Sequence, residues 1–171
     1  EQKNLMERQA KIDDLTQLYN RRHFYRKLRD AWIMRRIEGT PLSIVIFDLD
    51  HFKDINDTFG HLTGDAVLRQ VCQEIKSHVP QNGLVARYGG EEIILMLRNT
   101  ELDAAVNIAE RIRKAVEYLE LGCLDDPDFN VTVSGGVSCR VGRDTADTPD
   151  VLIKEADEAL YRAKSGGRNR I

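Results

Sequence analysis

The chain has 171 residues, with 25 Lys and Arg against 28 Asp and Glu, so its formal net charge is −3. Its length suits a single domain, and a composition of 42% apolar and 31% charged residues is typical of a folded globular protein. The acidic balance leaves no broad basic surface for nucleic acid, and no apolar run reaches the roughly 20 residues that span a bilayer, so we expect neither a nucleic-acid partner nor membrane contact.

The cysteines and the first residues indicate the compartment and the domain organisation. Cys72, Cys123 and Cys139 show no paired spacing, which favours free thiols in a reducing compartment, and we expect a cytoplasmic location. The first residues carry side chains at the spacing of a helix that is ending. We therefore interpret residues 1–13 as the end of a linker helix from a missing upstream region, and residues 14–171 as one domain.

Apolar periodicity in the first half predicts a helix, a strand and two further helices. Residues 22–37 carry apolar side chains at helical spacing. Residues 42–50 form an apolar run rich in branched side chains, which is typical of a strand buried on both faces. A short helix over residues 52–59 and a longer helix that starts near Asp65 are expected to follow.

A hairpin is expected around two adjacent glycines. Residues 84–88 and 91–97 are strand-like, and Gly89 and Gly90 stand between them. This pattern is typical of a tight turn in which both central residues need a positive φ.

The second half predicts a helix, a strand and a final helix. We expect a helix over residues 102–116 with Thr100 as its cap and a strand over residues 131–137. A last helix is expected with Thr148 as its cap and Pro149 at its first position, and it should stop at Gly166 and Gly167. Without the additional helices the order is β-α-β-β-α-β. This order predicts an α+β fold with a ferredoxin-like antiparallel four-stranded sheet and helices packed on one side.

Carboxylates gather at the end of the first strand. Asp48 and Asp50 leave one face of that strand, where buried acids are unstable unless a metal, a cation or water meets them. Glu91 and Glu92 point to opposite faces of the hairpin, so at most one of them readily meets Asp48. Oxygen ligands of this kind suit Mg²⁺ held together with substrate phosphates. The alternative is that the two aspartates cap the next helix and that the glycines form an ordinary turn.

Two cations and two polar side chains complete the candidate site. Lys164 and Arg168 flank the exit of the last helix, where they bind phosphate or complement the negative end of the helix. Asn56 and Asp65 can read the edge of a base through paired donors and acceptors; alternatively, they are a solvated residue and a helix cap. Acids for a metal, cations for phosphate and an Asn–Asp pair for a base together favour a nucleotide site.

Five segments of the chain, in the order of the family, resemble the GGDEF domain of bacterial diguanylate cyclases. The resemblance covers nearly the whole chain, and five such segments in order are highly specific. They read D-D-L-T-Q-L-Y-N-R-R-H-F at 13–24, F-D-L-D-H-F-K-D-I-N-D-T-F-G-H at 47–61, G-D-A-V-L at 64–68, R-Y-G-G-E-E-I at 87–93 and Y-R-A-K-S-G-G-R-N at 161–169.

The resemblance implies a nucleotidyl-cyclase-like palm that condenses two GTP molecules into cyclic di-GMP and releases pyrophosphate. One domain holds one GTP, so the resemblance implies a homodimer, with Mg²⁺ or Mn²⁺ as the metal. It assigns metal binding to Asp48, the Leu49 carbonyl, Glu91 and Glu92; catalysis to Glu91 as the candidate base and to Lys53; and substrate binding to His51, Lys53, Asn56, Asp65, Gly89, Gly90, Lys164 and Arg168.

Three departures from the family pattern bear on function. Ile93 stands where the family usually has Phe, beyond the metal-facing residues, so we expect a change in packing with some loss of rate. Gln17 replaces a common glycine in the N-terminal turn. Residues 80–83 read P-Q-N-G where many members carry an inhibitory R-x-x-D motif, so we expect product to bind in the GTP pocket instead. The alternative hypothesis is a weak or inactive domain that serves as a receptor for GTP or cyclic di-GMP.

Overall fold

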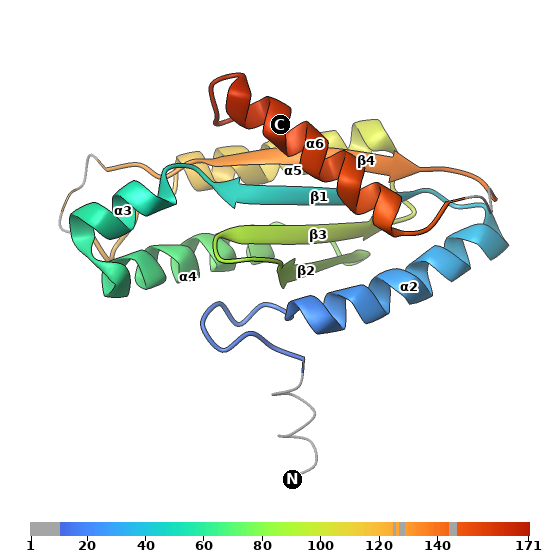
Figure 1. The fold of residues 1–171 in the computed structure, drawn as a ribbon, viewed down its shortest axis with the longest axis horizontal. Helices are drawn as coiled ribbons and strands as arrows, with labels where there is room; N and C mark the ends of the chain where they lie inside the picture. Colours follow the sequence, from blue (N-terminus) through green and yellow to red (C-terminus); the bar gives the residue numbers. More distant parts are fainter. Residues whose placement is uncertain (1–10, 125, 127–128, 144–146) are drawn as a thin grey trace, which may run out of the picture.

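Four antiparallel strands form the centre of the computed structural model, which describes residues 11–124, 126, 129–143 and 147–171. They lie in the order β2-β3-β1-β4 (Figure 1). Their bounds are Leu42–Leu49 for β1, Gly83–Arg87 for β2, Glu92–Arg98 for β3 and Val133–Arg140 for β4. The α+β class and the ferredoxin-like βαββαβ topology predicted from the sequence are therefore confirmed.

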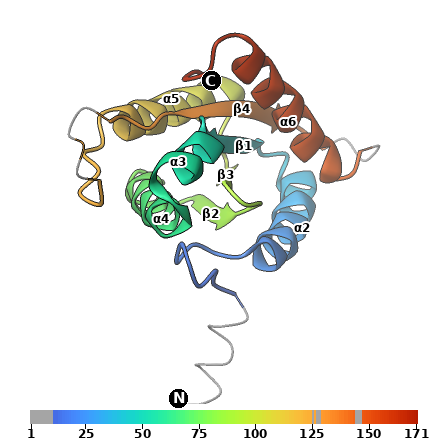
Figure 2. The same ribbon diagram turned by 60° about the vertical axis from the view of Figure 1, so that its left-hand side comes forward.

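Helices cover both faces of this sheet. α4 (His61–Ser77) and α5 (Leu102–Glu117) belong to the βαββαβ unit and pack on one face, and the short α3 (Phe52–Phe59) leads from β1 into α4. α2 (Arg21–Glu38) and α6 (Asp150–Ser165) pack on the opposite face, as Figure 2 shows. The expectation of helices on one side holds for the βαββαβ unit alone, because the additional helices bury their own apolar faces on the other side of the sheet.

The central strand β1 is buried along its whole length, because it lies between two strands and under helices on both faces. Val45 and Phe47 enter the core formed with α4 and α5, while Ile44 and Ile46 enter the core formed with α2 and α6. Each such side chain contributes about 1.5–3 kcal/mol by leaving water. This two-sided burial explains the unbroken apolar sequence of β1.

The β2–β3 hairpin is present, but its turn differs from the predicted one. The N–H groups of Tyr88 and Gly89 both donate to the carbonyl of Glu92, at 2.8 and 3.2 Å. Neither Gly89 nor Gly90 has a positive φ. The connection is therefore a four-residue loop over residues 88–91, which we call the hairpin loop, and the prediction of a two-residue turn is wrong.

The start of α4 also differs from the prediction. α4 begins at His61, so Asp65 lies in its second turn and is not its cap. Gly60 allows the early start: with φ of 86° it ends α3 and reverses the chain, and the next helix begins directly after it.

The predicted starts of two other helices, α5 and α6, also need correction. Glu101 is the N-cap residue of α5, while the hydroxyl of Thr100 donates to the carbonyl of Arg98 at 2.8 Å. α6 begins at Asp150, with Pro149 as its N-cap residue. Both differences arise because a cap is fixed by local backbone conformation, which residue type alone does not determine.

The chain enters the domain through an N-terminal loop, residues 11–20. Residues 11–13, expected to end a linker helix, instead form a turn and a β-bridge between Ile12 and Tyr19. The rest of that expected helix, residues 1–10, lies outside the described residues. In the described ranges, no helix combines the length and apolar content needed to cross a membrane.

Candidate active site

Acidic side chains meet where β1 ends and β3 begins. Asp48 pairs with Glu92 in the β1–β3 register, so both side chains leave the same face of the sheet. Asp48 is 8% exposed, and its Oδ1 accepts a 2.6 Å hydrogen bond from Nζ of Lys164 in α6. Glu91 lies in the hairpin loop, and its carbonyl accepts a hydrogen bond from the N–H of Leu49 at 3.3 Å. Glu92 is thus the glutamate that shares the face of Asp48.

These carboxylates repel one another. Burial raises the pKa of Asp48, and the charges of Glu91 and Asp50 raise it further; the ion pair with Lys164 opposes them, yet the pKa remains raised. Burial likewise raises the pKa of Glu92, with Asp48 the largest charge contribution. Burial and the neighbouring carboxylates together therefore outweigh the effect of Lys164 on these pKa values, and a further cation would be stabilised at this end of the sheet.

The donors present fit a hard divalent cation. Within the described ranges, no three His, Cys, Asp or Glu side chains form a ready metal cluster. Mg²⁺ and Mn²⁺ need no such cage, because they take one or two carboxylates and complete their shell with water and phosphate oxygens. Asp48, Glu91 and Glu92, with the carbonyl of Leu49, are the oxygen donors from which such an ion would be held.

A pocket of about 290 Å³ opens beside the acidic strand end, between α3, α4 and the hairpin loop. Asn56 lines it from α3, Asp65 from α4, and Gly90 and Glu91 from the hairpin loop. The structure therefore brings the predicted base-reading pair and the predicted catalytic base into one cavity. Gly89 does not line this pocket; a Cβ at its position would overlap the carboxylate of Glu92.

Asn56 is held against a glycine. Its Oδ1 is buried and has no hydrogen-bond partner within the described part of the chain. A Cβ at Gly64 would overlap this oxygen, so Asn56 can take its position only because residue 64 lacks a side chain. A buried polar atom without a partner costs about 1–3 kcal/mol, which a folded protein tolerates mainly at functional positions. The alternative that Asn56 is simply solvated does not agree with this burial.

The predicted phosphate-binding cations come from separate elements. Lys164 contacts Asp48, and Arg168, which follows α6, is exposed and has a positive φ of 65°. Lys53 and His51, at the start of α3, are exposed and each pairs with an aspartate on the same helix, at 3.4 and 3.3 Å. Lys53 lines the pocket, whereas His51 borders a neighbouring hollow. The structure thus places His51 outside the pocket that Lys53, Asn56, Asp65 and Gly90 line.

Asp50 does not cap the next helix. Its carboxylate is 3% exposed and accepts hydrogen bonds from the hydroxyls of Thr132 and Ser134, both at 2.7 Å, and from the N–H of Asn169 at 3.0 Å. The N-cap residue of α3 is His51, without a side-chain cap hydrogen bond. The helix-cap alternative for the two aspartates is therefore wrong. Asp50 instead joins β1 to β4 and to the C-terminal residues.

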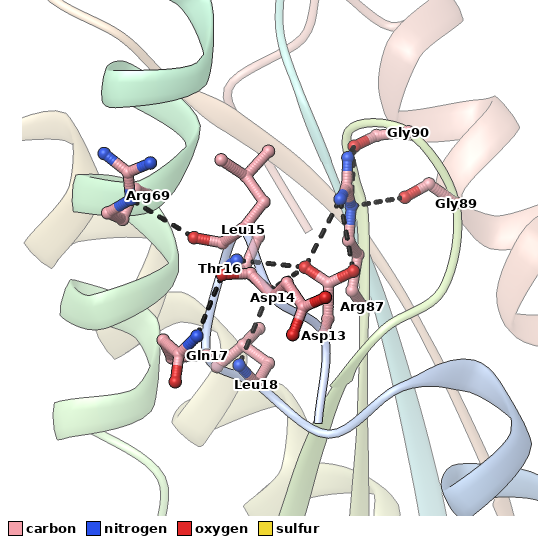
Figure 3. Close-up of polar contacts among 10 residues, drawn as sticks. All are labelled: Asp13, Asp14, Leu15, Thr16, Gln17, Leu18, Arg69, Arg87, Gly89 and Gly90. Atoms are coloured by element: carbon pink, nitrogen blue, oxygen red, sulfur yellow. Dashed lines mark hydrogen bonds and ion pairs between the residues drawn. The ribbon is translucent and has the colours of Figure 1, made fainter. Parts of the chain in front are cut away.

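Arg87 belongs to this site although the sequence analysis gave it no role. Its guanidinium donates to the carbonyls of Gly89 and Gly90, at 3.2 and 2.9 Å, and pairs with Asp13 of the N-terminal loop at 3.3 Å (Figure 3). The loop that carries Glu91 is thereby tied to the N-terminal loop. The sequence feature that could have indicated a role for Arg87 is its position two residues before the glycines of the matched segment.

The N-terminal loop is also tied to α4. Gln17 adopts a positive φ of 58°, the conformation that explains why a glycine is common there, and its N–H donates to the carbonyl of Asp13. Three side chains of α4 donate to three successive carbonyls of this loop: Arg69 to Leu15 at 3.2 Å, Gln73 to Thr16 at 2.7 Å and Lys76 to Gln17 at 3.2 Å. The turn thus forms despite the loss of the glycine.

An α+β domain with this topology, an acidic end of β1 and an adjacent polar pocket has the architecture of the cyclase-like palm. The family described as diguanylate cyclase, GGDEF domain, matches residues 10–170. The response regulator PleD of Caulobacter vibrioides is 42% identical over 163 residues, which cover 95% of this chain and 36% of PleD. Diguanylate cyclase A of Treponema denticola is 41% identical over 162 residues, which cover 93% of this chain and 43% of that protein.

A solved structure agrees with these sequence matches. The coiled coil and GGDEF domain of DgcB from Caulobacter crescentus, in complex with c-di-GMP, matches with a TM-score of 0.91 at 33% identity. The match covers 99% of this chain and 88% of that one. The chain therefore belongs to the GGDEF family of diguanylate cyclase domains, and it spans less than half the length of the two curated relatives.

Proposed function

We propose that this chain is a Mg²⁺-dependent diguanylate cyclase, which condenses two GTP molecules into cyclic di-GMP as a homodimer. The observation that carries the proposal is the pairing of Asp48 with Glu92 across β1 and β3, with Lys164 on Asp48 and the pocket of Asn56 and Asp65 alongside. The names of the relatives support it, since one is a diguanylate cyclase and the DgcB structure holds c-di-GMP.

The pocket suits a guanine base. Guanine presents a ring N–H and an exocyclic amine on one edge, and the two oxygens of Asp65 can accept from both. Asn56 lies across the pocket with its amide available to the same base, because its position is fixed by Gly64. Adenine has an acceptor where guanine has the ring N–H, so the carboxylate of Asp65 would repel it.

The triphosphate would lie toward the cations. Lys164 holds Asp48 in the substrate-free domain and, in this proposal, exchanges that carboxylate for a phosphate oxygen when GTP enters. Arg168 and Lys53 are exposed, and in this proposal they add positive charge where pyrophosphate develops as the leaving group.

The attacking group is the 3′-hydroxyl of the GTP held by the second domain. In this proposal Glu91, which lines the pocket, accepts the hydroxyl proton. When bound at Asp48 and the two glutamates, Mg²⁺ supplies charge neutralisation of the phosphates and lowers the pKa of the attacking hydroxyl. One pocket holds one GTP, so the bond forms only when two domains face each other.

The direct test is to incubate the full chain at high concentration with GTP and Mg²⁺ and to detect cyclic di-GMP by mass spectrometry. The Asp48→Ala/Glu91→Ala variant should give no product. A matched control, Asp30→Ala/Asp103→Ala, removes two exposed carboxylates from α2 and α5 and should retain full activity.

The receptor hypothesis remains an outcome of this experiment. If the chain makes no product even when a fused dimerising helix brings two copies together, while it still binds GTP or cyclic di-GMP, the domain is a nucleotide receptor. Equal product from the wild type and the Asp48→Ala/Glu91→Ala variant would instead overturn the assignment of the site.

A further inference from the structure

The chain after α6 is fixed in an unusual backbone conformation. We call residues 166–171 the C-terminal strap. Three successive residues of the strap have positive φ: Gly167 at 118°, Arg168 at 65° and Asn169 at 47°. Residues other than glycine rarely adopt this conformation, although Asn tolerates it better than most. Strained backbone persists only where surrounding contacts enforce it, and it concentrates at functional sites.

Asn169 makes the contacts that enforce this conformation. Its N–H donates to the buried Asp50 at 3.0 Å, its Oδ1 accepts from the guanidinium of Arg113 at 2.6 Å, and its Nδ2 donates to Glu117 at 2.8 Å. Both side-chain partners lie on α5, whereas Asp50 follows β1 directly. One asparagine thus joins the strap to two elements of the domain core.

The partners of Asn169 are themselves held in place. Arg113 is 9% exposed and also pairs with Glu110 and Glu117, each at 2.8 Å. The hydrogen bond from Asn169 is the largest cause of the lowered pKa of Glu117, with the bond from Arg113 next, so this carboxylate stays charged and accepting. The partners thus form a rigid anchor for the strap.

The far end of the strap is fixed to β4. The N–H of Gly135 donates to the carbonyl of Arg170 at 2.9 Å, and the side chain of Ile171 lies against Gly135, where a Cβ would not fit. Figure 2 shows the chain leaving α6 and returning to end beside α5. The strap is therefore held on both sides of Arg168, whose own N–H donates to the carbonyl of Ala163 at 3.1 Å.

We propose that Asn169 is a positioning residue for GTP: it anchors the strap to α5 and to Asp50, so that Arg168 is presented toward the strand end that carries Asp48. The inference rests on the proposed function, because it takes Arg168 as a phosphate-binding group. Arg168 is exposed, and no side-chain contact holds its guanidinium within the described residues, so its placement depends on the backbone that Asn169 fixes.

The test measures kcat, KM for GTP, and the GTP dissociation constant by calorimetry, for the full chain and for Asn169→Ala. If Arg168 is displaced from the triphosphate, KM for GTP and the GTP dissociation constant should rise about 10-fold, while kcat should fall less than about 3-fold. A merely structural role would lower the folded fraction, which reduces apparent kcat and leaves KM unchanged.

Two further variants keep the test decisive if Asn169→Ala folds poorly. Asn169→Gly accepts the positive φ but lacks the side-chain contacts, so KM should still rise; a full return to wild-type KM would show that only backbone strain matters and would overturn the proposal. Glu117→Ala leaves the strap sequence intact, removes one anchor, and should raise KM about 3-fold. The control is Asn99→Ala, which removes an asparagine with a similar φ of 50°. Asn99 follows the end of β3 that is remote from Asp48 and Glu92.

A double-mutant cycle tests whether Asn169 acts through Arg168. In an Arg168→Ala background, Asn169→Ala should change KM less than about 2-fold, because its effect requires the arginine. Additive effects, or an equal KM change in Asn99→Ala, would overturn the inference. If the wild type binds GTP without turnover, only the proposed cyclase activity is overturned, because the GTP dissociation constants of the variants still test the role of Asn169. If the wild type binds no GTP, the proposed activity and the role of Asn169 are both overturned.

Discussion

Ile93 lies directly opposite Phe47 across β1 and β3, and both side chains enter the core formed with α4 and α5. Asp48 and Glu92, the next pair along the same two strands, point to the other face. The departure from the family at position 93 therefore changes the packing beneath the acidic strand end and touches none of the metal or phosphate candidates.

Replacing Ile93 should cost stability more than substrate affinity. Ile93→Ala removes a fully buried side chain, so we expect the free energy of unfolding to fall by about 2–4 kcal/mol. KM for GTP should stay within about 2-fold of the wild type, because Ile93 points away from Asp48 and Glu92 and does not line the pocket. Urea denaturation and steady-state kinetics check this, with Ile37→Ala, an exposed residue of α2, as the control. A large KM change at full stability would contradict the packing interpretation.

Gly64 should determine base selectivity through Asn56. In Gly64→Ala the new methyl group displaces the side chain of Asn56, so we expect KM for GTP to rise about 10-fold and the preference for GTP over ATP to fall. Alanine favours a helix by about 1 kcal/mol over glycine, so the folded state should not be lost. Competition between GTP and ATP measures selectivity, and Gly122→Ala, where a methyl group meets only an ordinary contact, is the matched control. Unchanged selectivity would remove Asn56 from guanine recognition.

Asp13 should give the domain a stabilising contribution that disappears in acid. Burial alone would raise the pKa of Asp13, but hydrogen bonds from Thr16 and the charge of Arg87 outweigh it, so the pKa lies below its usual value. Because the pKa of Asp13 is lower in the folded chain than in the unfolded chain, its ionised form stabilises the fold. This contribution to the free energy of unfolding is complete above the unfolded-chain pKa of about 3.9, and it is lost as pH falls through the folded-chain pKa.

Asp13→Asn is the variant for this prediction. It should be less stable than the wild type at pH 7, and the difference should shrink as pH falls below about 4. Guanidinium denaturation at several pH values measures the free energies of unfolding, with Asp14→Asn, an exposed neighbour, as the control. A difference that stays constant down to pH 3 would show that the charge of Asp13 is not the stabilising feature.

Product should bind at the GTP pocket and not at the opposite end of the sheet. A hollow of about 300 Å³ lies at that end, bordered by Arg98 and Asn82. The amide of Asn82 is already occupied, since it donates to the carbonyl of Arg98 and, at 3.1 Å, to the hydroxyl of Thr100. Residues 80–83 supply neither Arg nor Asp.

Cyclic di-GMP titration should therefore distinguish two variants. Lys164→Ala/Arg168→Ala should weaken product affinity at least about 10-fold, because charged hydrogen bonds to phosphate contribute about 1.5–3 kcal/mol each. Arg98→Ala should leave affinity unchanged. The reverse pattern in calorimetry would place the product at the opposite end, despite the missing motif.

Local sequence patterns determined the elements of this protein and its family. The apolar run of β1, the helical stripes and the strand–glycine–strand pattern each reflect a period of a few residues, which burial imposes on neighbouring side chains. The five matched segments likewise identify the GGDEF family without a structure. Two of the predictions that were wrong, the two-residue turn and the cap at Thr100, concern backbone dihedrals that residue type constrains only weakly.

Only the tertiary structure decided how these elements combine into a site. Strand register makes Glu92 the partner of Asp48, and the packing of α6 on β1 brings Lys164 to an aspartate 116 residues earlier in the chain. The contacts of Arg87 with Asp13 and of Asn169 with α5 arise in the same way. A sequence pattern records periods along one element, whereas these contacts depend on how several elements pack, and no local period encodes that.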